Sequence, residues 1–268
     1  MSKIKLNNVN FTYKNGFEAL KSLSFEVEAG ETLAIIGQNG AGKTTTVKML
    51  NGLLKPTSGE VLIDGQNTAN TTTAKLAPTV GYVFQNPDDQ IFHNIVYEEI
   101  EYGAKVQKFD ADKKSKLVRD AIELLGLEPY INDHPYSLPY SIRKLVTVAS
   151  VVAMDSDVII LDEPTAGQDS HAIKMLGTLI KELKARGKTV IVITHDMDFV
   201  AENFERTIVM ANKELRYDGS TLDIFYDDNL LALAKLEEPH LIKVSKTLGL
   251  DIKTLDVNEL ASAIKGSK

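Results

Sequence analysis

A phosphate-binding loop is the feature that most constrains this chain. Residues 37–44 read Gly-Gln-Asn-Gly-Ala-Gly-Lys-Thr and match the G-x-x-x-x-G-K-[ST] pattern in full. An apolar run at 32–36 precedes the loop and a helical stretch at 43–53 follows it, as this motif requires. Glycines let successive backbone N–H groups point at a polyphosphate, and the helix N-terminus adds its dipole. The loop predicts binding of ATP or GTP, rather than a glycine turn that arose by chance. Within it, Lys43 is expected to neutralise the β- and γ-phosphates and Thr44 to ligate Mg²⁺.

Acidic and basic groups follow two later apolar runs. The run at 158–161 leads to Asp162 and Glu163, and the run at 190–193 leads to Thr194-His195-Asp196. In phosphoryl-transfer sites an Asp at such a strand end holds the Mg²⁺ shell, and a second carboxylate can orient or deprotonate the attacking water. Alone, the acidic pair could equally be a helix cap or a surface turn. A histidine at a strand end can reach a γ-phosphate. The other histidines are interpreted as surface or satisfied structural residues: His93, His134, His171 and His240.

The order of patterns indicates an α/β fold. Strand 158–161, helix 172–186 and strand 190–193 have the spacing of a parallel sheet with right-handed crossovers. Short alternations in the first third indicate further strands. From 89 to 154 the pattern is helical, with Ile95, Ile100 and Val106 marking one apolar face. We therefore predict an ATP-binding domain over 1–222, a helical part inserted at about 86–154, and a C-terminal helical region at 223–268.

Composition excludes several classes of protein. The chain has 268 residues, 43% apolar, with 30 basic against 37 acidic side chains and no cysteine. The net charge of −7 argues against a broad nucleic-acid surface, so no nucleic-acid partner is expected. Without cysteine there is no disulfide framework, thiolate metal site or cysteine nucleophile. The longest apolar candidate, 145–154, is far short of the ~18 residues of a membrane span. The N-terminus lacks the apolar core of a signal peptide. We expect a chain that does not cross a bilayer but could lie against a protein that does.

Taken in order, the motifs resemble those of the ATP-binding-cassette (ABC) ATPases. They are Tyr13, the loop GQNGAGKTT, Gln85 in YVFQNPDDQ, VIILDEPTAG at 158–167 and THD at 194–196. FQNPDDQIF at 84–92 resembles the ATPase subunits of energy-coupling-factor (ECF) importers. EEPHLIKVSKTLGL in the tail is similar, more loosely, to the C-terminal helical region through which those subunits pair. The resemblance implies an α/β P-loop ABC-type nucleotide-binding domain with an antiparallel β subdomain, an inserted helical subdomain and a C-terminal helical extension.

The resemblance also implies a role for each matching residue. Tyr13 would stack on adenine, although it could instead be a core aromatic of the first hairpin. Gln85 would sense Mg²⁺ and the γ-phosphate, and Asp162 would hold Mg²⁺ through water. Glu163 would be the catalytic carboxylate, His195 the switch histidine and Asp169 the acid of the D-loop, in which Gln168 stands where the family usually has an apolar residue. ATP would be bound by Tyr13 with Gly37, Gln38, Asn39, Gly40, Ala41, Gly42, Lys43, Thr44 and Thr45.

One segment departs from the family. At the place of the Leu-Ser-Gly-Gly-Gln signature the chain has Leu138, Pro139, Tyr140, Ser141 and Ile142. In the family this segment of one subunit closes over the γ-phosphate held by the other, through a serine hydroxyl, backbone N–H groups and a helix N-terminus. Pro139 removes the hydroxyl and an N–H, and Tyr140 puts a ring where glycine allows close approach. One lost donor typically costs about 3–4 kcal/mol of transition-state stabilisation. The sequence predicts a degenerate signature.

The resemblance implies an ATPase with ATP and Mg²⁺ as cofactors, powering uptake of a vitamin or metal ion. Its partners would be a second ABC ATPase subunit with an intact signature, an integral membrane coupling subunit and a substrate-binding membrane subunit. The chain would lie peripherally on the cytoplasmic face of the cell membrane. It would form one half of a heterodimer with one competent and one impaired ATP site. Two alternatives remain open: a regulatory pseudo-ATPase, and a non-transport ABC ATPase of DNA repair or chromosome maintenance.

Overall fold

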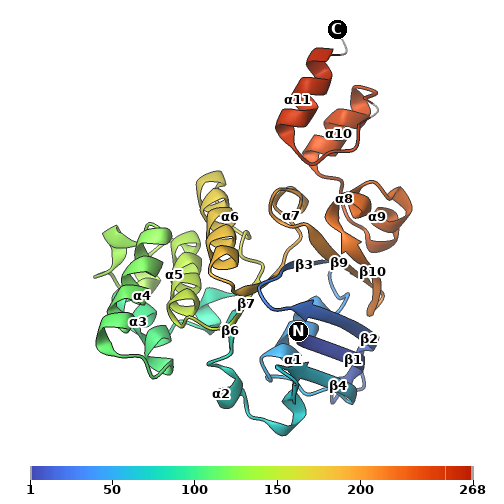
Figure 1. Cartoon of the computed structure of the whole chain (residues 1–268). Coiled ribbons are helices and arrows are strands. Elements are labelled where there is room, and N and C mark those ends of the chain that lie inside the picture. The colour runs from blue at the N-terminus through green and yellow to red at the C-terminus, as the bar shows by residue number, and fades with distance from the viewer. Residues whose placement is uncertain (1, 251, 267–268) are drawn as a thin grey trace.

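Two β-sheets form the centre of the computed structural model, which describes residues 2–250 and 252–266 (Figure 1). The smaller sheet is antiparallel in the order β2-β1-β4-β5, with bounds β1 Ser2–Thr12, β2 Glu18–Glu28, β4 Ser58–Ile63 and β5 Gln66–Asn67. The larger sheet has the order β10-β9-β3-β8-β7-β6, parallel except for β10. Its strands are β3 Thr32–Ile36, β6 Val80–Val83, β7 Val158–Asp162, β8 Thr189–Ile193, β9 Arg206–Ala211 and β10 Glu214–Ser220. The predicted α/β fold with an antiparallel sheet and helical parts is confirmed.

The parallel sheet is buried on both faces. Along β3, Leu33 and Ile35 belong to the core shared with the antiparallel sheet, whereas Ala34 and Ile36 belong to the core under the helices. Side chains alternate across a strand, so a strand covered on both faces must be apolar at every position. This explains why the sequence shows a continuous apolar run here rather than an alternation.

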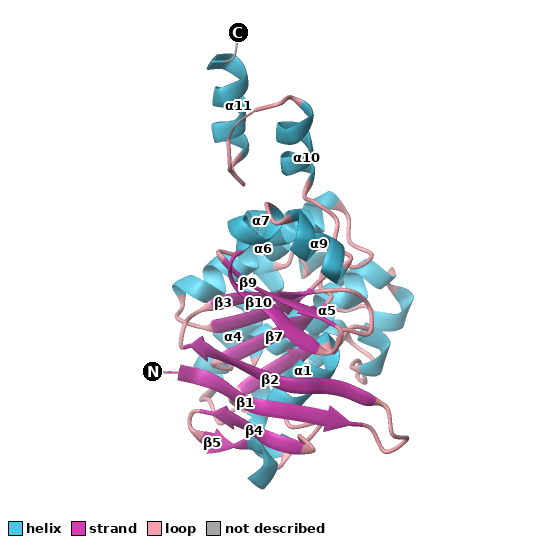
Figure 2. Cartoon of the chain, turned by 90° about the vertical axis from the view of Figure 1, so that its right-hand side faces the viewer, coloured by secondary structure: helices cyan, strands magenta, loops and turns pink. Residues whose placement is uncertain are grey.

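Helices cover the parallel sheet and extend away from it (Figure 1). The first part of the chain contributes α1 Lys43–Leu50 and α2 Thr73–Leu76, and the middle contributes α3 Val96–Val106, α4 Ala111–Leu124 and α5 Tyr140–Ala153. They are followed by α6 Ser170–Ala185, α7 Met197–Asn203, α8 Thr221–Phe225, α9 Asp228–Ala234, α10 His240–Thr247 and α11 Val257–Gly266. In both Figure 1 and Figure 2, α10 and α11 stand away from the two sheets at the C-terminal end. Across the described ranges, the helices are too short or too polar to cross a bilayer.

Two local predictions were wrong. The helix after the phosphate loop ends at Leu50 instead of residue 53, because Gly52 takes a left-handed φ of 77° that stops it. Ile95 caps α3 and is 38% exposed, while that helix buries Val96 and Ile100 on its inner face. The packing partner α5, which lies far along the sequence, decides this rotation of α3.

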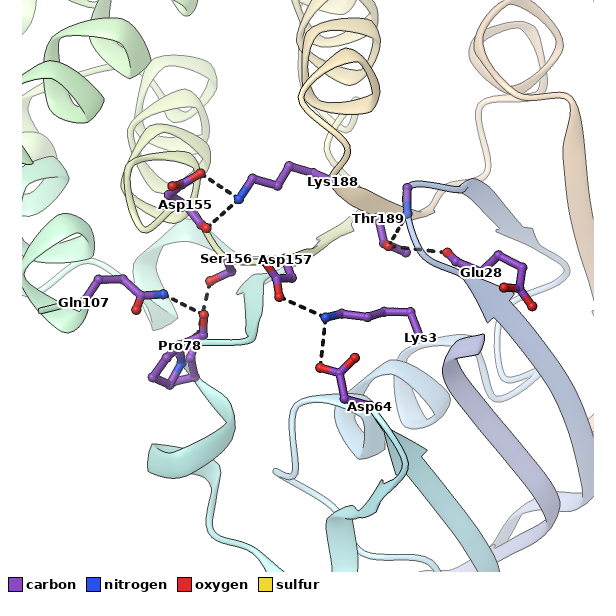
Figure 3. A network of polar contacts seen from close by, with 12 residues as sticks. Lys3, Glu28, Asp64, Pro78, Gln107, Asp155, Ser156, Asp157, Lys188 and Thr189 are labelled. Carbon is purple, nitrogen blue, oxygen red and sulfur yellow. Dashed lines mark hydrogen bonds and ion pairs between the residues drawn. The ribbon is translucent and has the colours of Figure 1, made fainter. Parts of the chain in front are cut away.

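Polar contacts fix the edge of the parallel sheet at which β7 and β8 begin (Figure 3). The Nζ of Lys3, on β1, donates to carboxylate oxygens of Asp64 and Asp157, both at 2.9 Å. Lys188 pairs with Asp155 at 2.7 Å. These contacts join the two sheets and the end of α5, and they lie at the opposite end of β7 from Asp162.

Candidate nucleotide-binding site

The phosphate loop joins β3 to α1 in a backbone shape that two glycines make possible. Gly37 has φ +147°, and a Cβ there would lie 2.0 Å from the carbonyl oxygen of Met210. Gly42 has φ +103°, and a Cβ there would lie 2.8 Å from the Ala19 carbonyl oxygen. Neither position admits a side chain without moving backbone. The loop is thus held against β9 and β2, and α1 begins directly after it.

Lys43 is buried at the start of α1. Its Nζ donates to the carbonyl oxygens of Gly37 at 2.6 Å and Gln38 at 3.2 Å. Burial lowers the pKa of Lys43, and the Glu163 and Asp162 carboxylates oppose that shift. The ammonium therefore lies within the curl of the loop with both acidic residues in its field, as the sequence predicts for a phosphate ligand.

Asp162 ends β7 as a buried carboxylate. Its Oδ2 accepts a 2.7 Å hydrogen bond from the Tyr82 hydroxyl, whereas its Oδ1 is buried without a partner among the described residues. Burial raises the pKa of Asp162, and the nearby Tyr82 and Thr44 hydroxyls oppose the rise. A free carboxylate oxygen close to a threonine hydroxyl is the hard-oxygen environment that suits hydrated Mg²⁺. The residues present fit this metal.

Glu163 and His195 form a pair at the ends of β7 and β8. These strands are parallel, with Asp162 opposite Ile193, so their carboxyl ends bring the two side chains together. His195 Nδ1 lies 2.8 Å from Glu163 Oε2. Burial raises the pKa of Glu163, while the His195 ring and the Lys43 ammonium lower it. Glu163 has a left-handed φ of 51°, and its N–H donates to Ile193 O at 2.8 Å. The pair can hold a water or a phosphate oxygen at the mouth of the loop.

Gln85 lies just beyond β6, with an exposed side chain. Its backbone is held from two sides: the Gln85 carbonyl oxygen accepts from Lys144 Nζ at 2.5 Å and from the Tyr140 hydroxyl at 3.3 Å. Gln90 also ties this loop, since its Oε1 accepts from the N–H of Phe84 at 3.0 Å. The loop that presents Gln85 is therefore fixed by α5 and by its own following turn.

Tyr13 lies beside the phosphate loop. Its hydroxyl is 3.0 Å from Thr45 Oγ1, and its ring meets Phe11 edge to face at 4.8 Å. At 37% exposure it is not the core aromatic that the sequence left open as an alternative. An exposed ring at this place has room to stack on a base.

A surface hollow of about 530 Å³ collects six of the predicted residues. From the predicted set it is lined by Gly37, Gln38, Asn39, Gln85, Glu163 and His195. Sequence reasoning missed a second wall, which comes from the segment after α9: Lys235, Leu236, Glu237, Glu238 and His240. His240, which the sequence indicates is a surface or satisfied structural residue, donates its N–H to Asp198 Oδ1 at 2.7 Å and lines this hollow. Only the long-range packing of the tail reveals this wall.

The signature segment lies at the start of α5, with Pro139 at its N-cap. Its residues contact their own chain. The Gln168 side-chain amide donates to Ser141 O at 3.1 Å, which accounts for the unusual residue at 168, and Tyr140 packs against Gly167. Asp169 caps α6, its Oδ1 accepting from Ala172 N at 2.8 Å.

Comparison with known proteins places the chain in a family. Residues 20–166 match the family model of the ABC transporter. An ABC transporter ATP-binding protein of Pyrococcus horikoshii is 41% identical over 97% of this chain and 99% of its own length. A relative from Methanosarcina acetivorans is 40% identical over 98% of this chain, which spans only 43% of that longer protein.

Solved structures agree with the sequence relatives. CbiO1 of Clostridium perfringens, described as part of the ABC transporter complex CbiONQ, superimposes with a TM-score of 0.75 at 32% identity, over 93% of this chain and 99% of its own. The cassette MJ0796, in a dimeric post-hydrolysis state with ADP and phosphate, gives 0.74 at 29% identity over 81% and 98%. The chain belongs to the ABC transporter ATP-binding family, whose members bind ATP with Mg²⁺ and hydrolyse it.

Proposed function

We propose that this chain powers an ECF-type importer of a vitamin or metal ion as one half of an asymmetric ATPase heterodimer. The observation that carries the proposal is the contrast within one chain. The phosphate loop has its lysine, Lys43, with Asp162 and the Glu163–His195 pair close by, as the family pattern requires. The signature position, in contrast, holds Pro139 and Tyr140. This half-site can bind and hydrolyse ATP once a partner supplies a proper signature.

In this proposal the residues of the half-site act in sequence. The loop N–H groups, Lys43 and Tyr13 bind the nucleotide, and Thr44 and Asp162 would hold Mg²⁺, which would neutralise charge on the phosphates. Glu163 orients and deprotonates the attacking water, for which its raised pKa suits it. His195, hydrogen-bonded to Glu163, holds that carboxylate in place and can donate to the γ-phosphate.

Two exposed surfaces support the transport role. Beside the Gln85 loop an aromatic cluster leaves Phe92 61% and Tyr102 43% exposed, with ring centroids 4.8 Å apart. Exposed aromatic rings are typical of protein interfaces, and here a helix of the membrane coupling subunit would dock. At the other end, Val244, Leu248 and Val257 of the C-terminal helical region are exposed apolar residues suited to pairing with the second ATPase.

The ECF class and the peripheral position on the cytoplasmic face of the membrane rest on similarity. FQNPDDQIF at 84–92 resembles the ECF motif, and CbiO1 is described as part of a transporter complex. Affinity purification of the chain from solubilised membranes tests this part of the proposal. We expect a second ABC ATPase and two integral membrane proteins to co-purify; recovery of the chain alone, or with DNA-repair proteins, would contradict it.

ATPase measurements test the asymmetry. The isolated chain should hydrolyse ATP slowly, and mixing with the partner ATPase should raise the rate by roughly 10²–10³, as expected where missing transition-state donors are restored. Changing residues 139–142 from Pro-Tyr-Ser-Ile to Ser-Gly-Gly-Gln should raise the activity of the isolated chain. Fast turnover by the unmodified isolated chain, abolished by Glu163→Gln, would refute the proposal.

A further inference from the structure

Lys144 is a charged residue in the interior, on the second turn of α5 and two residues beyond the signature segment. Its side chain is fully buried. Its Nζ donates three hydrogen bonds, to the carbonyl oxygens of Phe84 at 2.8 Å, Gln85 at 2.5 Å and Asp162 at 3.0 Å. All three acceptors are backbone atoms, so the ammonium has no direct carboxylate partner among these contacts.

These carbonyl oxygens share a place in the fold. Phe84 and Gln85 follow β6 directly, and Asp162 is the last residue of β7, its parallel neighbour. Carbonyl groups at strand ends lose their ladder partners and must be satisfied in another way when buried. An ammonium offers three donors and matches the three acceptors. Lys144 therefore fastens the ends of two strands to α5.

Burying an ammonium is costly, so a chain that retains one gains something in return. Burial lowers the pKa of Lys144 to about 8, against the opposing field of Asp162 and Glu163. Leucine or methionine would fill the same volume at less cost if only packing mattered. What the ammonium adds is a pair of hydrogen bonds that fix the backbone of Gln85 and Asp162.

We propose that Lys144 is a positioning residue for ATP hydrolysis. Its hydrogen bonds fix the position of Gln85 relative to Asp162, so that both side chains can reach Mg²⁺–ATP. The inference rests on the roles proposed above for those two residues. Since Lys144 belongs to α5, a shift of α5 would move the ends of β6 and β7 together. Tyr140, whose hydroxyl donates to the same Gln85 oxygen at 3.3 Å, adds a second tie to that loop.

The test uses the chain in its complex with the partner ATPase. Lys144→Met removes the donors at nearly constant shape, and Lys144→Arg restores donors and charge. Lys188→Met is the matched control, because Lys188 also donates to a backbone carbonyl, that of Asp155 at 2.7 Å, but at the far edge of the sheet (Figure 3). Two quantities are measured: kcat, and the Mg²⁺ concentration at which ATP gives half of its maximal thermal stabilisation, a readout independent of turnover.

Residues that orient metal ligands typically change affinity or activity by roughly 10–100-fold when removed. We expect Lys144→Met to lower kcat and raise the Mg²⁺ requirement by amounts in this range, while ATP binding in EDTA stays the same. Lys144→Arg should recover part of both, and Lys188→Met should lower the melting temperature alone. Should Lys144→Met fail to fold, Lys144→Gln, which keeps two donors, should give the same direction of change.

Asp162→Asn separates failure of this inference from failure of the proposed site. If Asp162→Asn leaves the Mg²⁺ requirement unchanged, the role proposed for Asp162 is wrong. If Asp162→Asn raises that requirement and Lys144→Met leaves both it and kcat at wild-type values, the positioning role of Lys144 is wrong.

Discussion

Replacing Tyr82 by phenylalanine isolates one hydrogen bond at the heart of the site. The Tyr82 hydroxyl is 2.7 Å from Asp162 Oδ2, and burial together with the Asp162 carboxylate raises the pKa of Tyr82, so the hydroxyl stays protonated and donates. The ring itself keeps its packing in the variant, including the edge-to-face contact with Phe84 at 4.9 Å. The substitution therefore removes a donor and little else.

The loss in free energy of unfolding caused by Tyr82→Phe depends on the hydrogen bonds that remain to Asp162. A hydrogen bond to a charged group contributes about 1.5–3 kcal/mol. Asp162 Oδ1 already lacks a hydrogen-bond partner among the described residues, and losing Tyr82 removes the bond to Oδ2, which leaves the carboxylate with only the nearby Thr44 hydroxyl. At about 1.4 kcal/mol for each factor of ten, the unfolding equilibrium constant should rise roughly 10- to 150-fold.

Urea denaturation in EDTA measures this loss. Tyr217→Phe is the control, because its hydroxyl has no hydrogen-bond partner in the described part of the chain. The Tyr82 bond favours the ionised carboxylate, so its stabilisation is present at high pH and is lost as pH falls through the raised pKa of Asp162. The difference between wild type and Tyr82→Phe should thus be largest at pH 8 and should shrink as the pH is lowered into the acid range. A loss no greater than that of Tyr217→Phe, or one independent of pH, would refute this reasoning.

Two further predictions concern stability. Gly103→Ala should lower the free energy of unfolding by about 3 kcal/mol or more, because a Cβ there would lie 1.8 Å from the Ser150 carbonyl oxygen, where α3 crosses α5. Gly65→Ala is the control, since this left-handed position faces open space. It should lower the free energy of unfolding by only about 1–2 kcal/mol in the same urea titration. Glu163→Gln should stabilise the nucleotide-free chain at pH 8. Burial raises the pKa of Glu163, so wild type loses stability as pH rises through that value, and the melting-temperature difference should shrink toward pH 4.

The central site could be predicted from sequence because its signals are local. The apolar run of β3, the loop glycines and the acidic pair at the end of β7 each follow from short-range pattern. The meeting of Glu163 with His195 follows from one further rule, that the carboxyl ends of parallel strands share an edge.

What escaped prediction depends on contacts distant in sequence. Lys144 stands next to Arg143 in α5 with no local sign that it is buried, and its hydrogen bonds reach carbonyl groups 59 and 60 residues away. The partner of Gln168, the Ser141 carbonyl oxygen, is likewise 27 residues away in sequence. The exposure of Ile95 likewise reflects how α3 packs against α5, which no local pattern encodes.

The asymmetry of the two ATP sites is the central claim, and one paired measurement tests it most directly. In the heterodimer with its partner ATPase, Glu163→Gln in this chain is compared with the equivalent Glu→Gln change in the partner. We expect Glu163→Gln to abolish steady-state ATP hydrolysis and the partner change to leave most of it, since only the site with the phosphate loop of this chain faces an intact signature. Equal losses from the two changes, or the larger loss from the partner change, would contradict it.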